Sequence, residues 1–145
     1  MKMKGATMKL EEALRIFRSF SDRTRLRIFL LLLDSELCVG ELMALLQLEQ
    51  SLISHQLKKL RQAGLVEQRK SGRWIYYRIP AARRQQLEPV LRDWLKEELM
   101  ASGRRVKAIK EKQVCRIPSS CTGRVKGATR MKAPAALKGK KFKKG

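Results

Sequence analysis

The sequence predicts a mainly α-helical domain that carries one small β-hairpin, and three observations support this fold class. Apolar residues recur at helical spacing along most of residues 10–60. Two strand-like segments then flank a Ser71-Gly72 turn. Residues 81–102 return to a helical pattern with a wide apolar stripe. A winged helix-turn-helix typically has this order of elements: apolar helices first, then a helix with a polar face, a basic hairpin and a closing helix.

The first helices are predicted from apolar spacing and from one capping signal. Ser21-Asp22 offers an N-cap, so a break at Ser21 should separate two helices. A third, short helix should follow and end near residues 47–49, although its turn contains no glycine. The apolar positions that define these helices are Leu10, Ala13, Leu14, Phe17, Phe20, Ile28, Leu31, Leu32, Val39, Leu42, Met43 and Leu46.

The next segment should form a helix with a polar outer face, followed by a hairpin. Ile53, Leu57 and Leu60 make an inward stripe, and Gly64 is the expected residue just past the helix end. Residues 65–70 and 74–79 are strand-like, and Ser71-Gly72 permits a tight reversal between them. Pro80 cannot donate a backbone hydrogen bond and should end the second strand.

A long final helix over residues 81–102 should carry more apolar surface than so small a core can cover. We therefore expect the terminal helices to pack across a two-fold axis in a homodimer. Residues 1–102 would form the DNA-binding and dimerisation domain. Residues 103–145 would form a basic, mostly disordered tail, because this stretch is too poor in apolar residues to offset its ordering entropy.

Charge and composition restrict the class of protein. The formal net charge is +21, and residues 101–145 hold 15 Lys/Arg against the single acidic Glu111, which favours a polyanionic partner. No apolar run is long enough to cross a membrane and the first residues lack a secretory signal pattern, so a cytoplasmic location is expected. The sequence shows no phosphate-cradling glycine loop and no C-x-x-C pair, so an enzyme is not expected.

The predicted reading head combines the polar helix with the hairpin. Gln50, Ser51, Ser54 and His55 are short or polar enough to meet base edges in a major groove. Basic residues farther along the helix and around the hairpin tip suit phosphates or an adjacent minor groove, although the hairpin charges could also merely solvate an exposed turn. These basic residues are Lys58, Lys59, Arg61, Arg69, Lys70 and Arg73.

Over about residues 10–100 the chain resembles the ArsR/SmtB family of winged-helix repressors, and its arsenic-responsive branch in particular. The motifs are SDRTRLRIFLLLL (21–33), ELCVGEL (36–42), SLISHQLKKLRQAGLV (51–66) and SGRWIYYRI (71–79). The resemblance implies a homodimer that binds double-stranded operator DNA and releases it when a metal or metalloid ion binds. It requires no constitutive cofactor.

The family's thiolate pair is incomplete in this sequence. Where the arsenic-responsive branch has Cys-Val-Cys, this chain has Cys38-Val39-Gly40. Cys115 and Cys121 resemble the C-terminal thiol cluster of some members, and they could hold arsenite or antimonite together with Cys38. Cys38 could instead only fill an apolar niche, and the two tail cysteines could be incidental.

Two other functions remain open at this stage. The cysteines could form a redox switch, with Cys115 and Cys121 joined by a disulfide under oxidants. Alternatively, the chain could be a general nucleic-acid binder driven by its basic tail, with little preference between operator and random duplex. The tail could also be only a solubilising extension.

Overall fold

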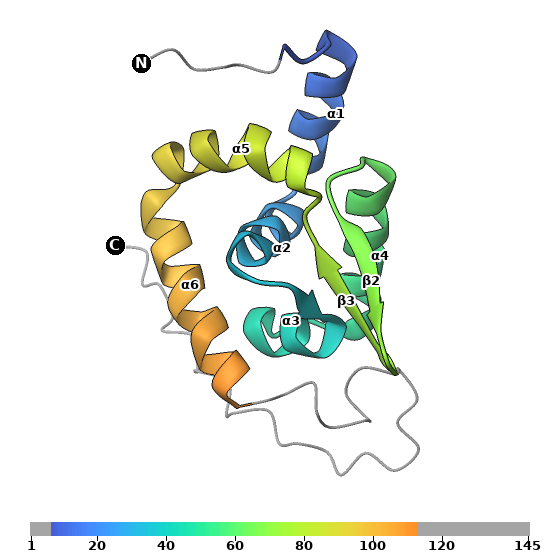
Figure 1. The fold of residues 1–145 in the computed structure, drawn as a ribbon, viewed down its shortest axis with the longest axis vertical. Helices are drawn as coiled ribbons and strands as arrows, with labels where there is room; N and C mark the ends of the chain where they lie inside the picture. The colour runs from blue at the N-terminus through green and yellow to red at the C-terminus, as the bar shows by residue number, and fades with distance from the viewer. Residues whose placement is uncertain (1–6, 113–145) are drawn as a thin grey trace, which may run out of the picture.

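The computed structural model describes residues 7–112. The elements follow the order α1 (Leu10–Phe20), α2 (Arg23–Asp34), β1 (Leu37–Cys38), α3 (Val39–Leu46), α4 (Gln50–Gln62), β2 (Glu67–Ser71), β3 (Trp74–Arg78), α5 (Ala81–Trp94) and α6 (Lys96–Glu111). Figure 1 shows α2 in the middle of the molecule, with the β2–β3 hairpin on one side and α6 on the other. The fold is the predicted winged helix-turn-helix.

The core is apolar and is built around α2. Its six consecutive residues from Ile28 to Leu33 are all buried, which leaves no solvent-facing stripe on that stretch. Helices α1, α4 and α6 pack against α2 from different sides. This arrangement explains why residues 28–33 form a continuous apolar run, since a stretch of helix that is covered on all faces has no polar side.

Capping residues set the helix limits as the sequence predicts. Asp22 is the N-cap of α2, and its carboxylate accepts a hydrogen bond from the backbone N–H of Arg25 at 3.0 Å. At the end of α4, Gly64 has a φ of +70°. The N–H of Gly64 donates to Arg61 O and that of Leu65 donates to Leu60 O, the paired bonds of a Schellman motif. The expected break at Ser21 and the expected helix stop at Gly64 are confirmed.

The sheet has the order β1-β3-β2 and contains one strand that the sequence analysis missed. Strand β1 is only two residues long, too short to show an alternating pattern. In the hairpin, Ser71 pairs with Trp74, so the two loop residues are Gly72 and Arg73. The expected Ser71-Gly72 tip is therefore shifted by one residue. Gly72 takes a φ of +61°, which suits the first loop position of a type II′ turn.

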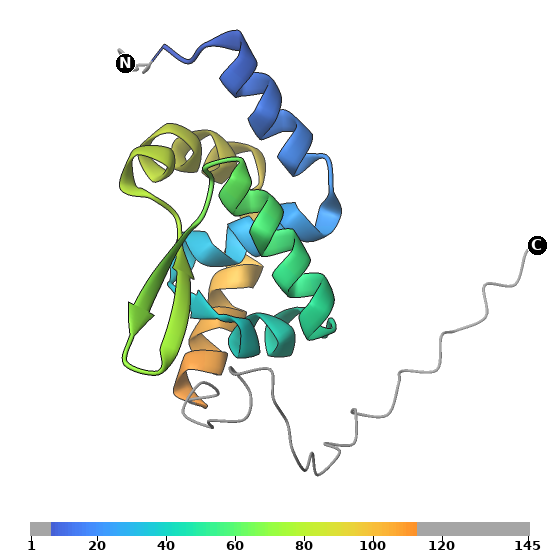
Figure 2. The same ribbon diagram turned by 90° about the vertical axis from the view of Figure 1, so that its right-hand side faces the viewer.

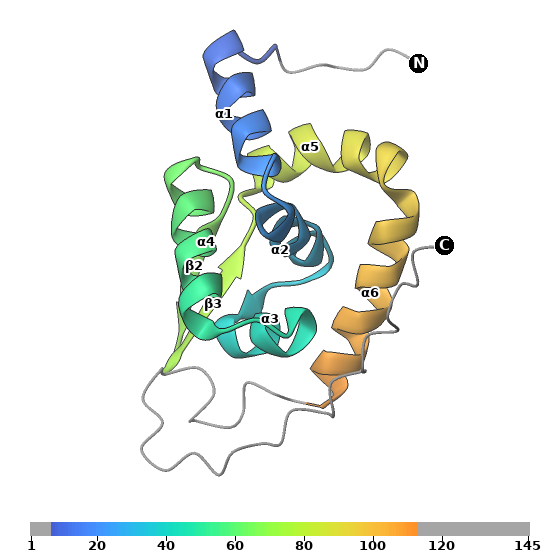
Figure 3. The ribbon, with the colours of Figure 1, turned by 180° about the vertical axis from the view of Figure 1, so that it is seen from behind.

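The expected single helix over residues 81–102 is wrong, because the structure has two helices that meet at Leu95. Leu95 has φ −123° and ψ +35°, outside the helical region, and α6 continues to Glu111. Figures 1 and 3 show that α5 crosses one end of the molecule and α6 runs along its side. The apolar stripe continues across the bend: α6 buries Leu99 and Val106, whereas on α5 Leu91 is buried and Trp94 is exposed. Helix α6 packs on α2 and α3.

An apolar groove lies between α1 and α5. Phe17 and Trp94, two large apolar side chains of its lining, expose 62% and 69% of their surfaces, and Leu10 at the start of α1 exposes 73%. The groove lining is almost entirely apolar and comprises Met8, Ala13, Ile16, Phe17, Phe20, Leu26, Gln86, Leu87, Val90, Leu91, Trp94 and Leu95. No helix within residues 7–112 is long and apolar enough to cross a membrane.

Candidate nucleic-acid interface

Helix α4 presents a polar face that is not used by the fold. Ser51, Ser54 and His55 are exposed, and Gln50 is half-buried at the start of the helix. Lys58, Lys59 and Arg61 are exposed farther along. Within residues 7–112 none of these seven side chains makes a hydrogen bond or an ion pair. The donors and acceptors of this face are therefore available to an outside partner.

The opposite face of α4 fixes the helix on the core. Ile53, Leu57 and Leu60 are at most 1% exposed, and burying each stabilises the fold by about 1.5–3 kcal/mol. Gln56, a polar residue that is only 7% exposed, accepts a hydrogen bond from the Arg25 guanidinium at 3.0 Å. Arg25 also donates to the carbonyl oxygen of Ser19 at 2.8 Å. This contact ties α4 to α2 and to the end of α1, and sequence spacing gave no sign of it.

The hairpin and the start of α4 lie toward the same end of the molecule. Figure 2 shows the tip of the β2–β3 hairpin and the N-terminal end of α4 at this end, with α1 and α5 at the opposite end. Lys70 and Arg73 at the tip are exposed and make no ion pair among the described residues. The hairpin has the position of a wing beside a recognition helix.

Arg69 differs from the other predicted contacts because it is already engaged. Its guanidinium donates to Glu36 at 2.8 Å through Nε, and it lies 5.5 Å from the ring centre of Tyr76. The hydrogen bond with Glu36 raises the pKa of Arg69 above its ordinary value. Arg78 is within 3.7 Å of Glu36 and pairs with Glu67 at 2.6 Å. These ion pairs link the wing to the segment just before β1.

Cys38 lies where the wing meets α3. It is fully buried, it pairs with Tyr76 of β3, and it is the N-cap residue of α3. Its backbone N–H donates to the Glu41 carboxylate at 2.9 Å. Cys38 is disulfide-bonded in the structure. Cys115 and Cys121, the other two predicted thiol ligands, lie outside the described residues.

A buried carboxylate beside Cys38 joins α3 to α6. Glu41 is 3% exposed, and the Lys110 ammonium is 3.1 Å from it. Lys110 also donates to the carbonyl oxygen of Glu36 at 2.6 Å and lies 5.6 Å from the ring centre of Tyr76. The Cys38-x-x-Glu41 spacing is that of a capping box, so the contact between these two residues could have been predicted from the sequence. Nothing in the sequence indicates that Lys110 joins them. Within residues 7–112, no three His, Cys, Asp or Glu side chains are grouped as a metal site.

The family is decided by comparison with known proteins. Residues 22–68 match the model of the arsR family of bacterial regulatory proteins. The arsenic resistance transcriptional regulator ArsR2 of Pseudomonas putida is 41% identical over 88 residues, which are 60% of this chain and 70% of that protein. The chain belongs to the ArsR family. Like these relatives, it is a transcriptional regulator and not an enzyme.

Further known proteins are similar to this chain in sequence and in fold. The transcriptional activator HlyU of Vibrio cholerae is 39% identical over 84 residues, 53% of this chain and 78% of HlyU. The structure of reduced HlyU matches with a TM-score of 0.54 and 33% identity, over 59% of this chain and 90% of HlyU. A homodimeric winged helix-turn-helix domain from Mycobacterium bovis, described as a possible ArsR-family regulator, gives a TM-score of 0.55 at 27% identity, over 67% and 94% of the two chains.

Proposed function

We propose that this ArsR-family protein is a cytoplasmic transcriptional repressor that reads operator DNA with α4 and clamps it with the wing. The observation that carries the proposal is the unpartnered polar face of α4, which lies toward the same end of the molecule as the basic wing tip. Gln50, Ser51, Ser54 and His55 would meet base edges. Lys58, Lys59, Arg61, Lys70 and Arg73 would hold phosphates and so fix the register of the helix.

Arg69 has a different part in this proposal. Its ion pair with Glu36 must open, or be shared, before the guanidinium can bind a phosphate. Because exposed ion pairs contribute little free energy, a phosphate can compete for Arg69 at small cost. Arg69 would then connect DNA binding to the segment that leads into Cys38.

The proposed repressor acts as a homodimer through the groove between α1 and α5. Phe17 and Trp94 belong to a contiguous, exposed apolar groove of the kind that marks protein–protein contacts, and the M. bovis relative has a homodimeric domain. Helices α1 and α5, which contribute most of the groove lining, lie at the end of the molecule opposite the reading head (Figure 2). A two-fold dimer of this kind would read two half-sites in successive major grooves, which are about 34 Å apart on DNA.

We further propose that the chemical state of Cys38 controls operator affinity. Cys38 pairs with a wing strand and begins α3, the helix that precedes the recognition helix. A change at its sulfur therefore acts on both parts of the reading head through short backbone connections. A difference in operator affinity between the two states is what regulation requires.

The first candidate inducer is a thiophilic metalloid, arsenite or antimonite, held by Cys38, Cys115 and Cys121. Three thiolates suit these soft ions, and the P. putida relative is an arsenic resistance regulator. Binding requires reduced thiols, so a reductant must first reduce the disulfide at Cys38. A coupling of about 3 kcal/mol would weaken operator binding on the order of 100-fold.

The second candidate is a thiol redox signal, and the disulfide at Cys38 is the observation that favours it. Formation of a disulfide removes two protons and two electrons from two thiols, which an oxidant such as peroxide accepts. The sequence suggested a disulfide between Cys115 and Cys121, whereas this version of the switch includes Cys38. Oxidation and metalloid binding would then compete for the same sulfur.

Fluorescence anisotropy on the protein's own promoter DNA distinguishes these inducers. The reduced dimer should bind the promoter more tightly than a random duplex. Arsenite or antimonite should lower that affinity if the inducer is a metalloid, and peroxide should lower it if the signal is oxidation. Cys38→Ser should bind promoter DNA like the parent and lose the response. Full response in Cys38→Ser would exclude Cys38, and equal affinity for promoter and random DNA would favour the general nucleic-acid binder.

A further inference from the structure

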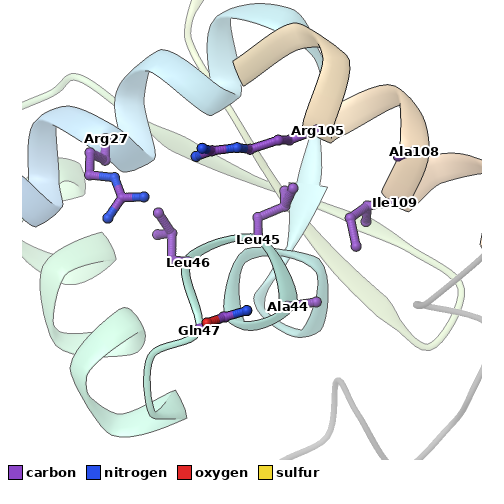
Figure 4. A pocket seen from close by; sticks show the side chains of 8 residues that line it. All are labelled: Arg27, Ala44, Leu45, Leu46, Gln47, Arg105, Ala108 and Ile109. Carbon is purple, nitrogen blue, oxygen red and sulfur yellow. The ribbon is translucent and has the colours of Figure 1, made fainter. Parts of the chain in front are cut away.

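A second concave site lies between α2, the end of α3 and α6, away from Cys38 and from the dimerisation groove. Its volume is about 570 Å³. Figure 4 shows its lining, in which α6 covers the end of α3. The lining residues are Arg27, Ala44, Leu45, Leu46, Gln47, Arg105, Ala108 and Ile109.

The charge of this pocket is positive and unbalanced. Arg27 of α2 and Arg105 of α6 point toward one another across it (Figure 4), and no acidic residue belongs to the lining. Within residues 7–112 neither guanidinium makes a hydrogen bond or an ion pair. Two converging like charges repel, and guanidinium groups match carboxylate and phosphate oxygens through two parallel hydrogen bonds. The pair of arginines therefore favours an anion between them.

The remaining lining supplies a polar donor and an apolar wall. Gln47 has a φ of +54° and a ψ of +45°, a left-handed conformation that few residues other than glycine, asparagine and aspartate adopt. Gln47 is the C-cap of α3, and a left-handed residue is a common end of a helix. Its side-chain amide lies in the pocket, below Arg27 and Arg105 in Figure 4. Leu45, Leu46 and Ile109 make the wall apolar.

We propose that this pocket binds a small organic anion, a carboxylate or phosphate monoester that carries an apolar group. The oxygens would bind Arg27 and Arg105, and the apolar group would lie on the leucine and isoleucine side chains. Gln47 is three residues before Gln50, the first residue of α4. A ligand that spans α2, α6 and this turn therefore restrains the start of the recognition helix and alters operator affinity.

Calorimetric titration of the reduced, full-length dimer without DNA tests the site. Benzoate is the probe for an apolar carboxylate, benzamide is its uncharged counterpart, and inorganic phosphate is an oxyanion without an apolar group. Benzoate should bind, benzamide should not, and phosphate should bind more weakly than benzoate. Arg27→Gln and Arg105→Gln should each lower benzoate affinity at least about tenfold. Arg104→Gln, a neighbouring exposed arginine outside this pocket, is the matched control and should leave it unchanged.

Three results would overturn the proposal. If no probe binds and both arginine variants lose thermal stability, the arginines only offset the negative end of the α3 dipole. If no probe binds and Arg105→Gln reduces the salt dependence of DNA binding, the pocket holds a backbone phosphate of DNA instead. Benzoate binding that survives both arginine substitutions would also contradict the assignment. Because the titration contains no DNA, its outcome is independent of the proposed operator reading.

Discussion

The link between Glu41 and Lys110 makes an asymmetric prediction about stability. The Glu41 side chain is 4% exposed and that of Lys110 is 35% exposed. Lys110→Met leaves a buried carboxylate whose only other described donor is the Cys38 N–H, and it should cost about 1–3 kcal/mol. Glu41→Gln keeps an oxygen for that N–H and leaves the half-exposed ammonium bound to Glu36 O, so its cost should be about 1 kcal/mol or less.

The double variant decides whether a buried charge causes the loss. Adding Glu41→Gln to Lys110→Met removes the uncompensated carboxylate, so the double variant should be more stable than Lys110→Met alone. Urea unfolding at one protein concentration and fixed redox conditions measures these differences. Lys107→Met, an exposed lysine on the same helix, is the control and should stay within about 0.5 kcal/mol of the parent. Equal costs for the two single variants, or strict additivity in the double variant, would show that the buried carboxylate is not the cause of the loss.

Three further predictions test other parts of the molecule. Phe17→Glu places a charge in the α1–α5 groove, so sedimentation velocity should show a monomer at concentrations where the parent is a dimer. Lys70→Gln and Arg73→Gln should each lower the salt slope of operator binding by about 0.9 per lost phosphate contact, about 2 per dimer, in anisotropy titrations at several salt concentrations. Gly64→Ala forces a side chain into a φ of +70° and should reduce the unfolding free energy by about 1 kcal/mol in urea, without changing the dimer.

Local chemistry explains what the sequence could predict. The cap at Asp22 and the glycine stop at Gly64 act within a few residues, so the helix limits around them follow from short patterns. The polar outer face of α4 and its inward stripe follow from helical periodicity alone. Exposure of the predicted α4 residues agrees with that pattern.

Features that depend on distant residues were not predictable in the same way. The bend at Leu95 lies within an unbroken apolar stripe, so the pattern does not show it. Beyond the bend, α6 packs on α2 and α3. Strand β1 forms only by antiparallel pairing with β3, and its two residues are too few to show the alternating pattern of a strand. The Glu41–Lys110 pair spans 69 positions, and the pairing of Arg69 with Glu36 spans 33. No local pattern specifies such pairs.

The central claim, that the exposed face of α4 reads base edges, is tested most directly by comparing promoter DNA with a random duplex. The measured quantity is the ratio of the two dissociation constants at one salt concentration, for the parent and for Gln50→Ala combined with Ser54→Ala. The preference for promoter DNA should fall on the order of tenfold or more in the double variant, while its affinity for the random duplex is retained. A folded double variant with the parent's full preference for its promoter would contradict the account.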